Sequence, residues 1–303
     1  MMKDKTVGFI GLGCMGLLMA RNLLKAGFHL IGCDIKETPL REIRVLGAET
    51  TTSPLEVGKA DTVIIMVQNF PQVREVVLGG KGVLENMREG SVIIVMSTIS
   101  PVEIKMVAKE AEDRGIRALD APVSGGVKGA AEGALTIMAG GTKEIFEHCK
   151  PLLSVMGKNV FHVGEVGMGQ TVKMVSQLMF CVGLVTSAEA MVLGSKAGVD
   201  PDLLLKVVSV TAGDSLAFRR EVPLMIARNF ETQGALRILT KDTKIALDVA
   251  GELGVPVLLT SIAHQIYRMA EGRGLGDEDD AAVVKVIEEW ADTKVGGHSS
   301  DQP

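Results

Sequence analysis

Three glycines near the N-terminus, Gly11, Gly13 and Gly16, stand between an apolar run at 7–10 and a helix-like stretch at 17–26. In a strand, turn and helix order, Gly11 permits a tight turn, Gly13 lets backbone approach a phosphate, and Gly16 lets the helix pack closely on the strand. The N–H groups at the start of the helix then face an anion. The loop predicted to bind a dinucleotide pyrophosphate comprises Gly11, Leu12, Gly13, Met15 and Gly16.

A carboxylate, Asp34, directly follows the next apolar run, residues 28–33. At this distance from the glycines it can accept hydrogen bonds from both hydroxyls of an adenosine ribose and repel a 2′-phosphate, which favours NAD over NADP. Lys36 could accommodate that phosphate, so NADP remains an alternative. The other interpretation of Asp34 is a solvated cap of a turn.

Lys173 follows the glycine-spaced segment 164–169 and opens a long apolar stretch, with Ser176 and Gln177 on the same face of a predicted helix. Its neighbours are apolar, so the amine should be partly desolvated. Burial lowers the pKa of a lysine and makes its neutral form accessible near neutral pH, as a general base requires. A solvated charge at a helix start is the alternative interpretation.

A third polar segment, Asp120 to Gly126, follows a predicted strand and therefore lies at the carboxyl edge of the sheet. Within it, Ser124, Gly125 and Gly126 expose backbone N–H groups with little shielding, which suits a carboxylate. The alternative is a glycine loop that only turns the chain.

The elements that must position these groups change character along the chain. Short apolar runs alternate with helix-like stretches up to residue 163, which predicts an α/β domain whose early strands are parallel. Helix starts are marked by Ser53-Pro54 and by Ser100, Pro101 and Glu103. The predicted strands are 6–10, 28–33, 61–67, 91–96, 117–120, 135–139 and 160–163.

Beyond residue 163 the strand signals stop and helices are expected. We predict three regions: an α/β domain at 1–163, an all-helical domain at 164–295 and a disordered tail at 296–303. Residues 174–194 are apolar enough for a membrane span, but polar residues interrupt them, so a buried helix between the domains is preferred. The predicted helices are 168–197, 201–211, 215–228, 236–253, 257–272 and 279–291.

Composition narrows the class of protein. The net charge of −5 and the absence of a basic stripe argue against nucleic acid as a partner. The four cysteines lack the paired spacing of a metal site or redox dithiol, so they are expected to be reduced core thiols. The first residues leave no room for a secretory signal, which favours a cytoplasmic protein.

Taken in order, the glycine loop, the segment Asp120 to Gly126 and the helix of Lys173 resemble the β-hydroxyacid dehydrogenase family, typified by 3-hydroxyisobutyrate dehydrogenase. The resemblance extends over residues 6–292 and includes Ser97-Thr98 and Lys241-Asp242. It implies an N-terminal Rossmann domain and an all-helical C-terminal domain joined by a long helix, with the active site between them. It also implies NAD or NADP as the cofactor and a small hydroxy acid as the substrate.

The resemblance implies a role for each matching residue. Lys173 would be the catalytic general acid/base. The residues implied to bind substrate are Ser124, Gly125, Gly126, Gln177, Thr98 and Asp242. Those implied to bind the cofactor, besides the glycine loop, are Asp34, Val67, Gln68, Thr98 and Lys241, and no metal is implied.

The chain departs from this pattern at Ser176 and Gln177, where the family commonly has two asparagines. Because glutamine keeps both an amide donor and an acceptor, we expect retained chemistry with altered substrate preference. Residues 212–220 resemble the branch acting on four-carbon aldonates such as threonate, in which Ser215 and Arg219 or Arg220 could face the substrate; solvated helix charges are the alternative. Other candidate substrates are 3-hydroxyisobutyrate and D-glycerate or tartronate semialdehyde.

Two further hypotheses keep the fold. A catalytically silent dinucleotide-binding module could serve as an interaction platform, and an imine reductase could use another proton donor; the presence of Lys173 argues against both. The apolar helical domain also predicts a homodimer or homotetramer.

Overall fold

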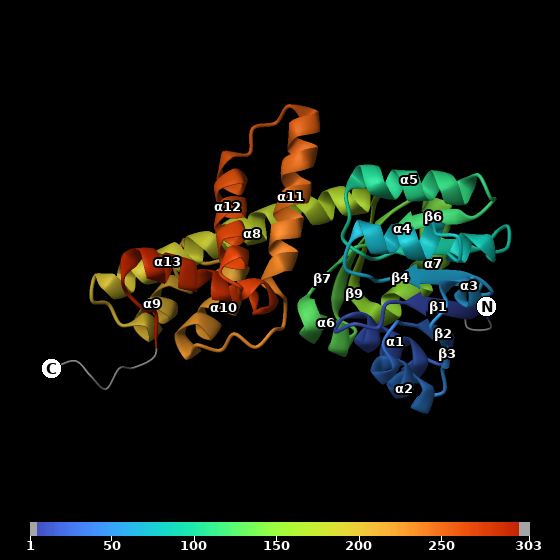
Figure 1. Ribbon diagram of the computed structural model, residues 1–303, viewed down its shortest axis with the longest axis horizontal. Coiled ribbons are helices and arrows are strands. Elements are labelled where there is room, and N and C mark those ends of the chain that lie inside the picture. Colours follow the sequence, from blue (N-terminus) through green and yellow to red (C-terminus); the bar gives the residue numbers. More distant parts are fainter. Residues whose placement is uncertain (1–4, 297–303) are drawn as a thin grey trace. The chain divides into compact units, whose positions relative to one another are not determined.

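The computed structural model describes residues 5–296 (Figure 1). The chain forms two compact units that meet in sequence at residues 173 and 174. The first is an α/β unit and the second is helical, which confirms the predicted order of architectures. From residue 297 on, the predicted tail lies outside the described residues.

Within the described residues, the nine strands of the first unit form one sheet, in the order β3-β2-β1-β4-β5-β6-β8-β7, with β9 beside β8. The strands from β3 to β6 are parallel, whereas β8 runs antiparallel to β6 and β7. The strands are β1 (Thr6–Ile10), β2 (His29–Cys33), β3 (Glu49–Thr51), β4 (Thr62–Ile65), β5 (Val92–Val95), β6 (Arg117–Asp120), β7 (Val123–Ser124), β8 (Leu135–Gly140) and β9 (Gly157–Gly164).

Two of these strands, β3 and β7, are absent from the sequence prediction. Each is only three or two residues long, and β3 consists of polar residues, so neither produces an apolar run. The helices of this unit are α1 (Gly16–Lys25), α2 (Glu37–Val45), α3 (Pro54–Val57), α4 (Phe70–Leu78), η2 (Val83–Glu85), α5 (Pro101–Glu112), α6 (Gly126–Glu132) and α7 (Lys143–Met156).

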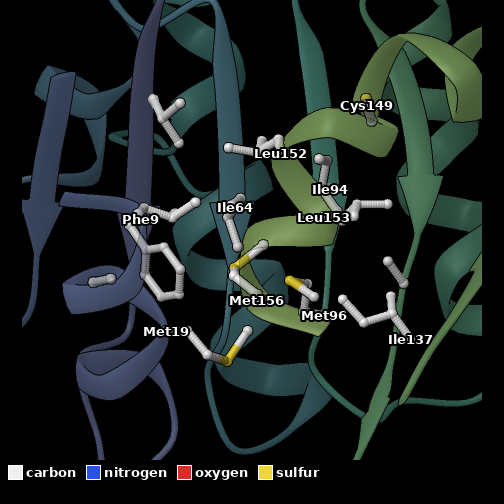
Figure 2. Close-up of a cluster of buried hydrophobic side chains, with 14 of the residues drawn as sticks. Phe9, Met19, Ile64, Ile94, Met96, Ile137, Cys149, Leu152, Leu153 and Met156 are labelled. Atoms are coloured by element: carbon white, nitrogen blue, oxygen red, sulfur yellow. The ribbon is translucent and has the colours of Figure 1, made fainter. Parts of the chain in front are cut away.

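Neighbouring residues of a strand point to opposite faces of the sheet, and helices pack on both faces. On one face Phe9, Ile64 and Ile94 belong to the same buried cluster as Met19 of α1 and Met156 of α7 (Figure 2). The cluster on the other face contains residues of α3, α4 and α5 together with Ile10, Val63, Ile65, Ile93 and Val95. The carboxyl ends of the parallel strands are therefore the edge left for a binding site.

The second unit is built from helices around its own buried core. Leu184, Phe218 and Tyr267 lie in this core. The helices are α8 (Met168–Lys196), which begins in the first unit, α9 (Pro201–Val208), α10 (Leu216–Ala227), α11 (Leu236–Leu253), α12 (Leu258–Gly272), η3 (Leu275–Asp277), η4 (Asp280–Val283) and α13 (Val284–Ala291).

Helix α8 is, among the described residues, the one helix long and apolar enough to cross a membrane by length and composition. Such a helix alone is weak evidence, because a core helix of a soluble protein passes the same test. Cys181, Leu184 and Ala188 on α8 are fully buried in the helical core. Packing within the second unit therefore accounts for part of the apolar composition of α8.

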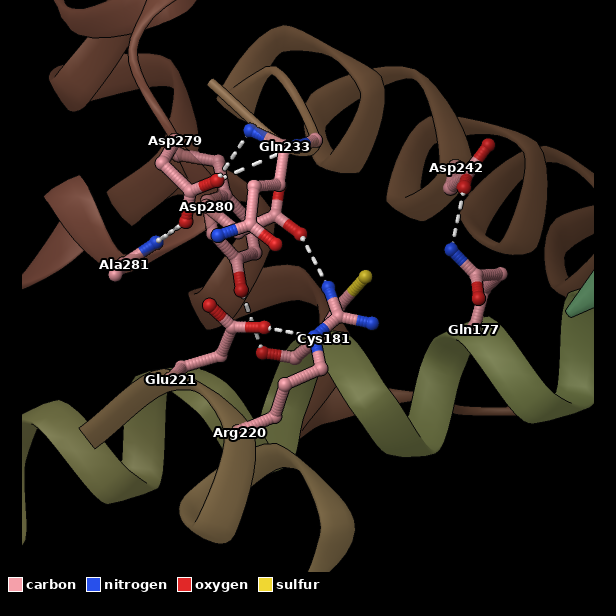
Figure 3. Close-up of polar contacts among 11 residues, drawn as sticks. Gln177, Cys181, Arg220, Glu221, Gln233, Asp242, Asp279, Asp280 and Ala281 are labelled. Atoms are coloured by element: carbon pink, nitrogen blue, oxygen red, sulfur yellow. Dashed lines mark hydrogen bonds and ion pairs between the residues drawn. The ribbon is translucent and has the colours of Figure 1, made fainter. Parts of the chain in front are cut away.

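Three acidic side chains are buried together in the second unit: Glu221, Asp279 and Asp280 (Figure 3). Arg220 pairs with both Glu221 and Asp280, whereas Asp279 accepts the backbone N–H of Gln233 at 2.8 Å. Burial is the main cause that raises the pKa of Glu221 and the pKa of Asp280, because a single guanidinium offsets the loss of water only in part.

We expect Glu221→Gln to gain stability over the wild type as the pH rises from 5 to 8. Since folding raises the pKa of Glu221, its contribution to the free energy of unfolding is fully present below its ordinary pKa of 4.5 and is lost as pH rises through the folded value. Glutamine stays neutral throughout. We expect the difference in Tm to grow by about 2 °C or more.

Thermal denaturation at both pH values, followed by circular dichroism, measures this difference. The matched control is Glu189→Gln, at an exposed position of α8. A Tm difference for Glu221→Gln that stays constant over this pH range would contradict the expectation.

Candidate functional site

The glycine loop joins β1 to α1, and two of its glycines are required by close backbone contacts. Gly11 has a φ of 94°, and a Cβ there would lie 2.3 Å from the carbonyl oxygen of Met66. A Cβ on Gly16 would lie 1.9 Å from the carbonyl oxygen of Gly11. A Cβ on Gly13 would instead meet no protein atom within 4 Å. Gly13 is therefore not needed for packing within the unit.

The same loop has the features that a pyrophosphate requires. Gly13 is exposed, and Met15, the N-cap of α1, makes no side-chain hydrogen bond to the start of this helix. Backbone N–H groups at such a helix start, together with the helix dipole, favour an anion. The residues present thus fit a dinucleotide.

Asp34 lies just after β2 and is tied to the glycine loop. Its Oδ2 accepts the backbone N–H of Leu12 at 2.7 Å, and its Oδ1 accepts that of Lys36 at 2.8 Å. Asp34 therefore caps its own turn and also holds the loop that follows β1. The side chain of Leu12 is buried, so it contributes to the core.

The ends of β4 and β5 lie side by side, because these strands are neighbours in the sheet. The backbone N–H of Val67 donates to the Ser97 Oγ at 2.8 Å, and that of Gln68 donates to Gln72 Oε1 at 2.9 Å. Thr98, which follows Ser97, is partly exposed. This places Val67, Gln68 and Thr98 at the same carboxyl edge as the glycine loop.

Ser124, Gly125 and Gly126 lie where β7 leads into α6. Ser124 is partly exposed and pairs with Thr136 of β8. Gly125 is exposed and has a φ of 132°, a conformation that a side chain would strain. The short strand β7 thus orients the segment that was expected to bind a carboxylate.

Lys173 lies near the start of α8 and is only 7% exposed, in agreement with the expected desolvation. The preceding turn is held by Asp120, which is fully buried at the end of β6. Its two carboxylate oxygens accept the N–H groups of Gly167 and Gln170, each at 2.7 Å. Burial raises the pKa of Asp120 to about 6, while these N–H donors favour the charged form.

Gln170 is a buried polar side chain that sequence reasoning missed. Its amide bonds the backbone of residues 97 and 99, on either side of Thr98. The signal in the sequence is slight: an uncharged polar residue between Gly169 and Lys173, in a stretch of small and apolar residues.

In the second unit, Gln177, Lys241 and Asp242 form one polar group, of which Figure 3 shows Gln177 and Asp242. Gln177 Nε2 donates to Asp242 Oδ2 at 2.7 Å, and Lys241 Nζ lies 2.9 Å from Asp242 Oδ1. Asp242 is buried, so these contacts compensate for its loss of water. Gln177 is four residues after Lys173 on α8, and this spacing places both on one helix face.

Ser215, Arg219 and Arg220, in the segment 212–220, have contacts within the second unit. Ser215 caps α10 by accepting the N–H of Phe218 at 3.0 Å. Arg219 pairs with Asp214, and Arg220 lies in the carboxyl cluster of Glu221 and Asp280. These contacts account for the three side chains without a bound substrate.

The cysteines differ in exposure. Cys33, Cys149 and Cys181 are buried, as expected of core thiols, and burial raises the pKa of Cys33 and of Cys149 to about 12. The prediction is wrong for Cys14, which is exposed because it lies in the turn of the glycine loop. Among residues 5–296, no group of three or more His, Cys, Asp or Glu side chains could hold a metal ion.

Both units of the chain are similar to known dehydrogenases. Residues 6–164 match the NAD-binding domain of 6-phosphogluconate dehydrogenase, and residues 167–287 match the NAD-binding family of NADP-dependent 3-hydroxyisobutyrate dehydrogenase. The 2-(hydroxymethyl)glutarate dehydrogenase of Eubacterium barkeri is 38% identical, with 98% of this chain and 99% of the relative aligned.

Two other proteins are similarly close. The L-threonate dehydrogenase of Cupriavidus necator is 36% identical, with 94% of this chain and 96% of the relative aligned. A crystal structure of 3-hydroxyisobutyrate dehydrogenase from Salmonella typhimurium superposes with a TM-score of 0.87 at 36% identity, covering 93% of this chain and 100% of that one.

Proposed function

The chain belongs to the β-hydroxyacid dehydrogenase family, and from this premise we propose that it oxidises a small 3-hydroxy acid with Lys173 as general acid/base. As a member it is an NAD(P)-dependent oxidoreductase acting on the CH–OH group of a hydroxy acid. The observation that carries the assignment of Lys173 is its burial near the start of α8, directly after the turn that Asp120 holds at the sheet edge.

In the proposed mechanism, Lys173 Nζ accepts the hydroxyl proton of the substrate and returns it when the reaction runs backwards. The chemistry that a bound NAD(P)⁺ would supply is a hydride acceptor for the carbon that carries this hydroxyl. Ser124, Gly125 and Gly126 hold the substrate carboxylate, while Gln177 and Asp242 orient the rest of the molecule. The residues proposed to hold the cofactor are the glycine loop, Asp34, Val67, Gln68, Thr98 and Lys241.

We propose three candidate substrates: 3-hydroxyisobutyrate, D-glycerate with its partner tartronate semialdehyde, and a four-carbon aldonate. The similarity to an L-threonate dehydrogenase and to 3-hydroxyisobutyrate dehydrogenases supports this range. Gln177, one methylene longer than asparagine and bonded to Asp242, supports a substrate preference of its own.

The experiment is a substrate screen of the purified protein with NAD and with NADP, following reduced cofactor by its absorbance. Oxidation of one or more 3-hydroxy acids is the expected result. Cofactor binding without turnover of any acid would instead favour a silent binding module, and reduction of cyclic imines alone would favour an imine reductase.

The proposed NAD preference predicts a change of cofactor in Asp34→Ser. Serine removes the charge that repels a 2′-phosphate, and it also removes the acceptor for the N–H of Leu12. We expect the ratio of kcat/KM for NADP to that for NAD to rise by about 10-fold or more, since one lost charge repulsion corresponds to ~1.4 kcal/mol or more.

Asp61→Ser is the matched control for this prediction. The Oδ2 of Asp61 likewise accepts a backbone N–H, that of Thr6 at 3.0 Å, but just before β4 and therefore at the amino edge of the sheet. This variant should lose stability without a change in the cofactor ratio. An unchanged ratio in Asp34→Ser would remove Asp34 from the proposed role.

We also propose that the protein is a homodimer or homotetramer. Several large apolar side chains of the second unit are more than half exposed in the single chain and would be covered in an oligomer. They are Met179, Leu193, Val210, Leu216, Leu258 and Leu259. Light scattering coupled to gel filtration measures the mass of the particle, and the mass of a single chain would contradict the proposal.

A further inference from the structure

The side chain of Gln170 connects the first turn of α8 to the segment between β5 and α5. Gln170 Nε2 donates to the carbonyl oxygen of Ser97 at 2.8 Å, and the N–H of Ile99 donates to Gln170 Oε1 at 3.2 Å. Gln170, Ser97 and Ile99 are all about 1% exposed. The two bonds therefore hold the backbone on either side of Thr98, without competition from bulk water.

The backbone of Gln170 is held independently by Asp120. Asp120 Oδ2 accepts the N–H of Gln170 at 2.7 Å, and Oδ1 accepts that of Gly167 at the same distance. The main chain of Gln170 is thus fixed to the end of β6 while its side chain is fixed to the segment after β5. These strands are neighbours in the sheet.

Close glycine contacts leave this arrangement little room to shift. A Cβ on Gly169 would lie 2.3 Å from the carbonyl oxygen of Met138 and 2.7 Å from Asp120 Oδ2. A Cβ on Gly140 would lie 2.5 Å from Asp120 Oδ1. Helix α8 therefore starts directly against the sheet, and its register is set by backbone contacts.

We propose that Gln170 is a positioning residue, which fixes the Thr98 backbone relative to the helical turn that carries Lys173. The inference rests on the proposed function, in which Thr98 and Lys173 lie beside the reacting atoms. Gln170 and Lys173 are three residues apart on one helix, about 4.5 Å along its axis. A rigid connection over this distance transmits the position of one side chain to the other.

The first test is Gln170→Leu, which removes both bonds while keeping an apolar side chain of similar size. We expect kcat to fall by about 10- to 100-fold, because small misplacements of catalytic groups have effects of this size. The Kd of NADH should change less than about 3-fold, because Thr98 is only one of several residues proposed to hold the cofactor and these bonds do not involve the glycine loop or Asp34.

A second measurement needs neither cofactor nor substrate. Hydrogen–deuterium exchange of the cofactor-free protein should show faster exchange of the Ile99 amide in Gln170→Leu, because this amide loses its acceptor. The matched control is Asn86→Leu, which breaks the 3.0 Å bond from Asn86 Nδ2 to the carbonyl oxygen of Leu55. Leu55 lies in α3, before β4, and Asn86 follows η2, before β5. This bond is therefore at the amino edge of the sheet, opposite the proposed site.

The third test is Gln170→Glu, which is nearly the same shape. Its protonated form can donate to the Ser97 carbonyl and accept from Ile99, whereas its ionised form places a charge against that carbonyl. Burial raises the pKa of a carboxyl group above its usual ~4.3. We therefore expect the kcat of Gln170→Glu relative to the wild type to recover as the pH falls from 8 to 5.

Turnover is expressed per site that binds NADH, so a variant that only folds poorly keeps its kcat. Were Gln170→Leu insoluble, the pH recovery of Gln170→Glu would still decide. Wild-type protein without turnover would remove the proposed function together with this inference. Active wild type, with kcat in Gln170→Leu within about 2-fold of it, or no pH recovery in Gln170→Glu, would overturn the role of Gln170 alone.

Discussion

Lys173→Met is expected to lower kcat by about 10³-fold, within the range that general acid–base groups contribute. Methionine has a similar length and an apolar side chain, so it fits a position that is only 7% exposed without leaving a large cavity. It cannot accept the hydroxyl proton. The reaction then depends on water, which this buried position largely excludes.

The measurement is kcat with the best acid of the substrate screen, together with the Kd of NADH from its fluorescence. We expect the Kd to stay within a few-fold of the wild type, because the glycine loop is intact. Lys173→Arg should be nearly as inactive as Lys173→Met, since a guanidinium keeps the charge but does not lose its proton near neutral pH. Activity in the arginine variant would show that charge, not proton transfer, is what Lys173 supplies.

Lys150→Met is the matched control for the loss of a lysine. Lys150 belongs to α7 in the same α/β unit, and its side chain is half exposed. Its removal should leave kcat within about 2-fold, as expected for most surface substitutions. Near-normal turnover in Lys173→Met, with this control unchanged, would remove Lys173 from the mechanism.

Gly13→Ala is expected to weaken NADH binding by about 10- to 100-fold while the protein stays folded. Its Cβ would meet no protein atom within 4 Å, so the unit itself tolerates the methyl group. The pyrophosphate must approach the backbone at this position, and a methyl group there opposes it by roughly 1–3 kcal/mol. Fluorescence titration with NADH and thermal denaturation measure the two effects separately.

Gly80→Ala controls for the methyl group itself. A Cβ on Gly80 also meets no protein atom within 4 Å, and this residue lies after α4, outside the glycine loop. It should bind NADH like the wild type. Unchanged affinity in Gly13→Ala would show that the pyrophosphate does not pass over Gly13.

Gly16→Ala should behave in the opposite way. Its Cβ would lie 1.9 Å from the carbonyl oxygen of Gly11, so the loop or the start of α1 has to move. Stability and NADH binding should therefore fall together. The contrast between Gly13 and Gly16 separates a glycine needed by the ligand from one needed by the fold.

The sequence alone determined the features that depend on neighbouring residues. Apolar runs separated by helix starts predicted the α/β unit and the parallel order of its early strands, and the capping residues Ser100 and Glu103 predicted the start of α5, where the capping box is present. The glycine loop and Asp34 were identified from their spacing. The apolar periodicity and the capping residues act over a few neighbouring residues, so their physical causes lie within the local chain.

Only the tertiary structure decided which distant groups meet. Asp120 and Gln170 are 50 residues apart, and Gln170 and Ser97 are 73 apart, so their hydrogen bonds leave no periodic pattern in the sequence. From the sequence, Arg220 could face the substrate or be a solvated helix charge, whereas the structure pairs it with Asp280, 60 residues away. Such contacts depend on how the strands and helices pack, because packing brings together buried polar groups that must then satisfy one another.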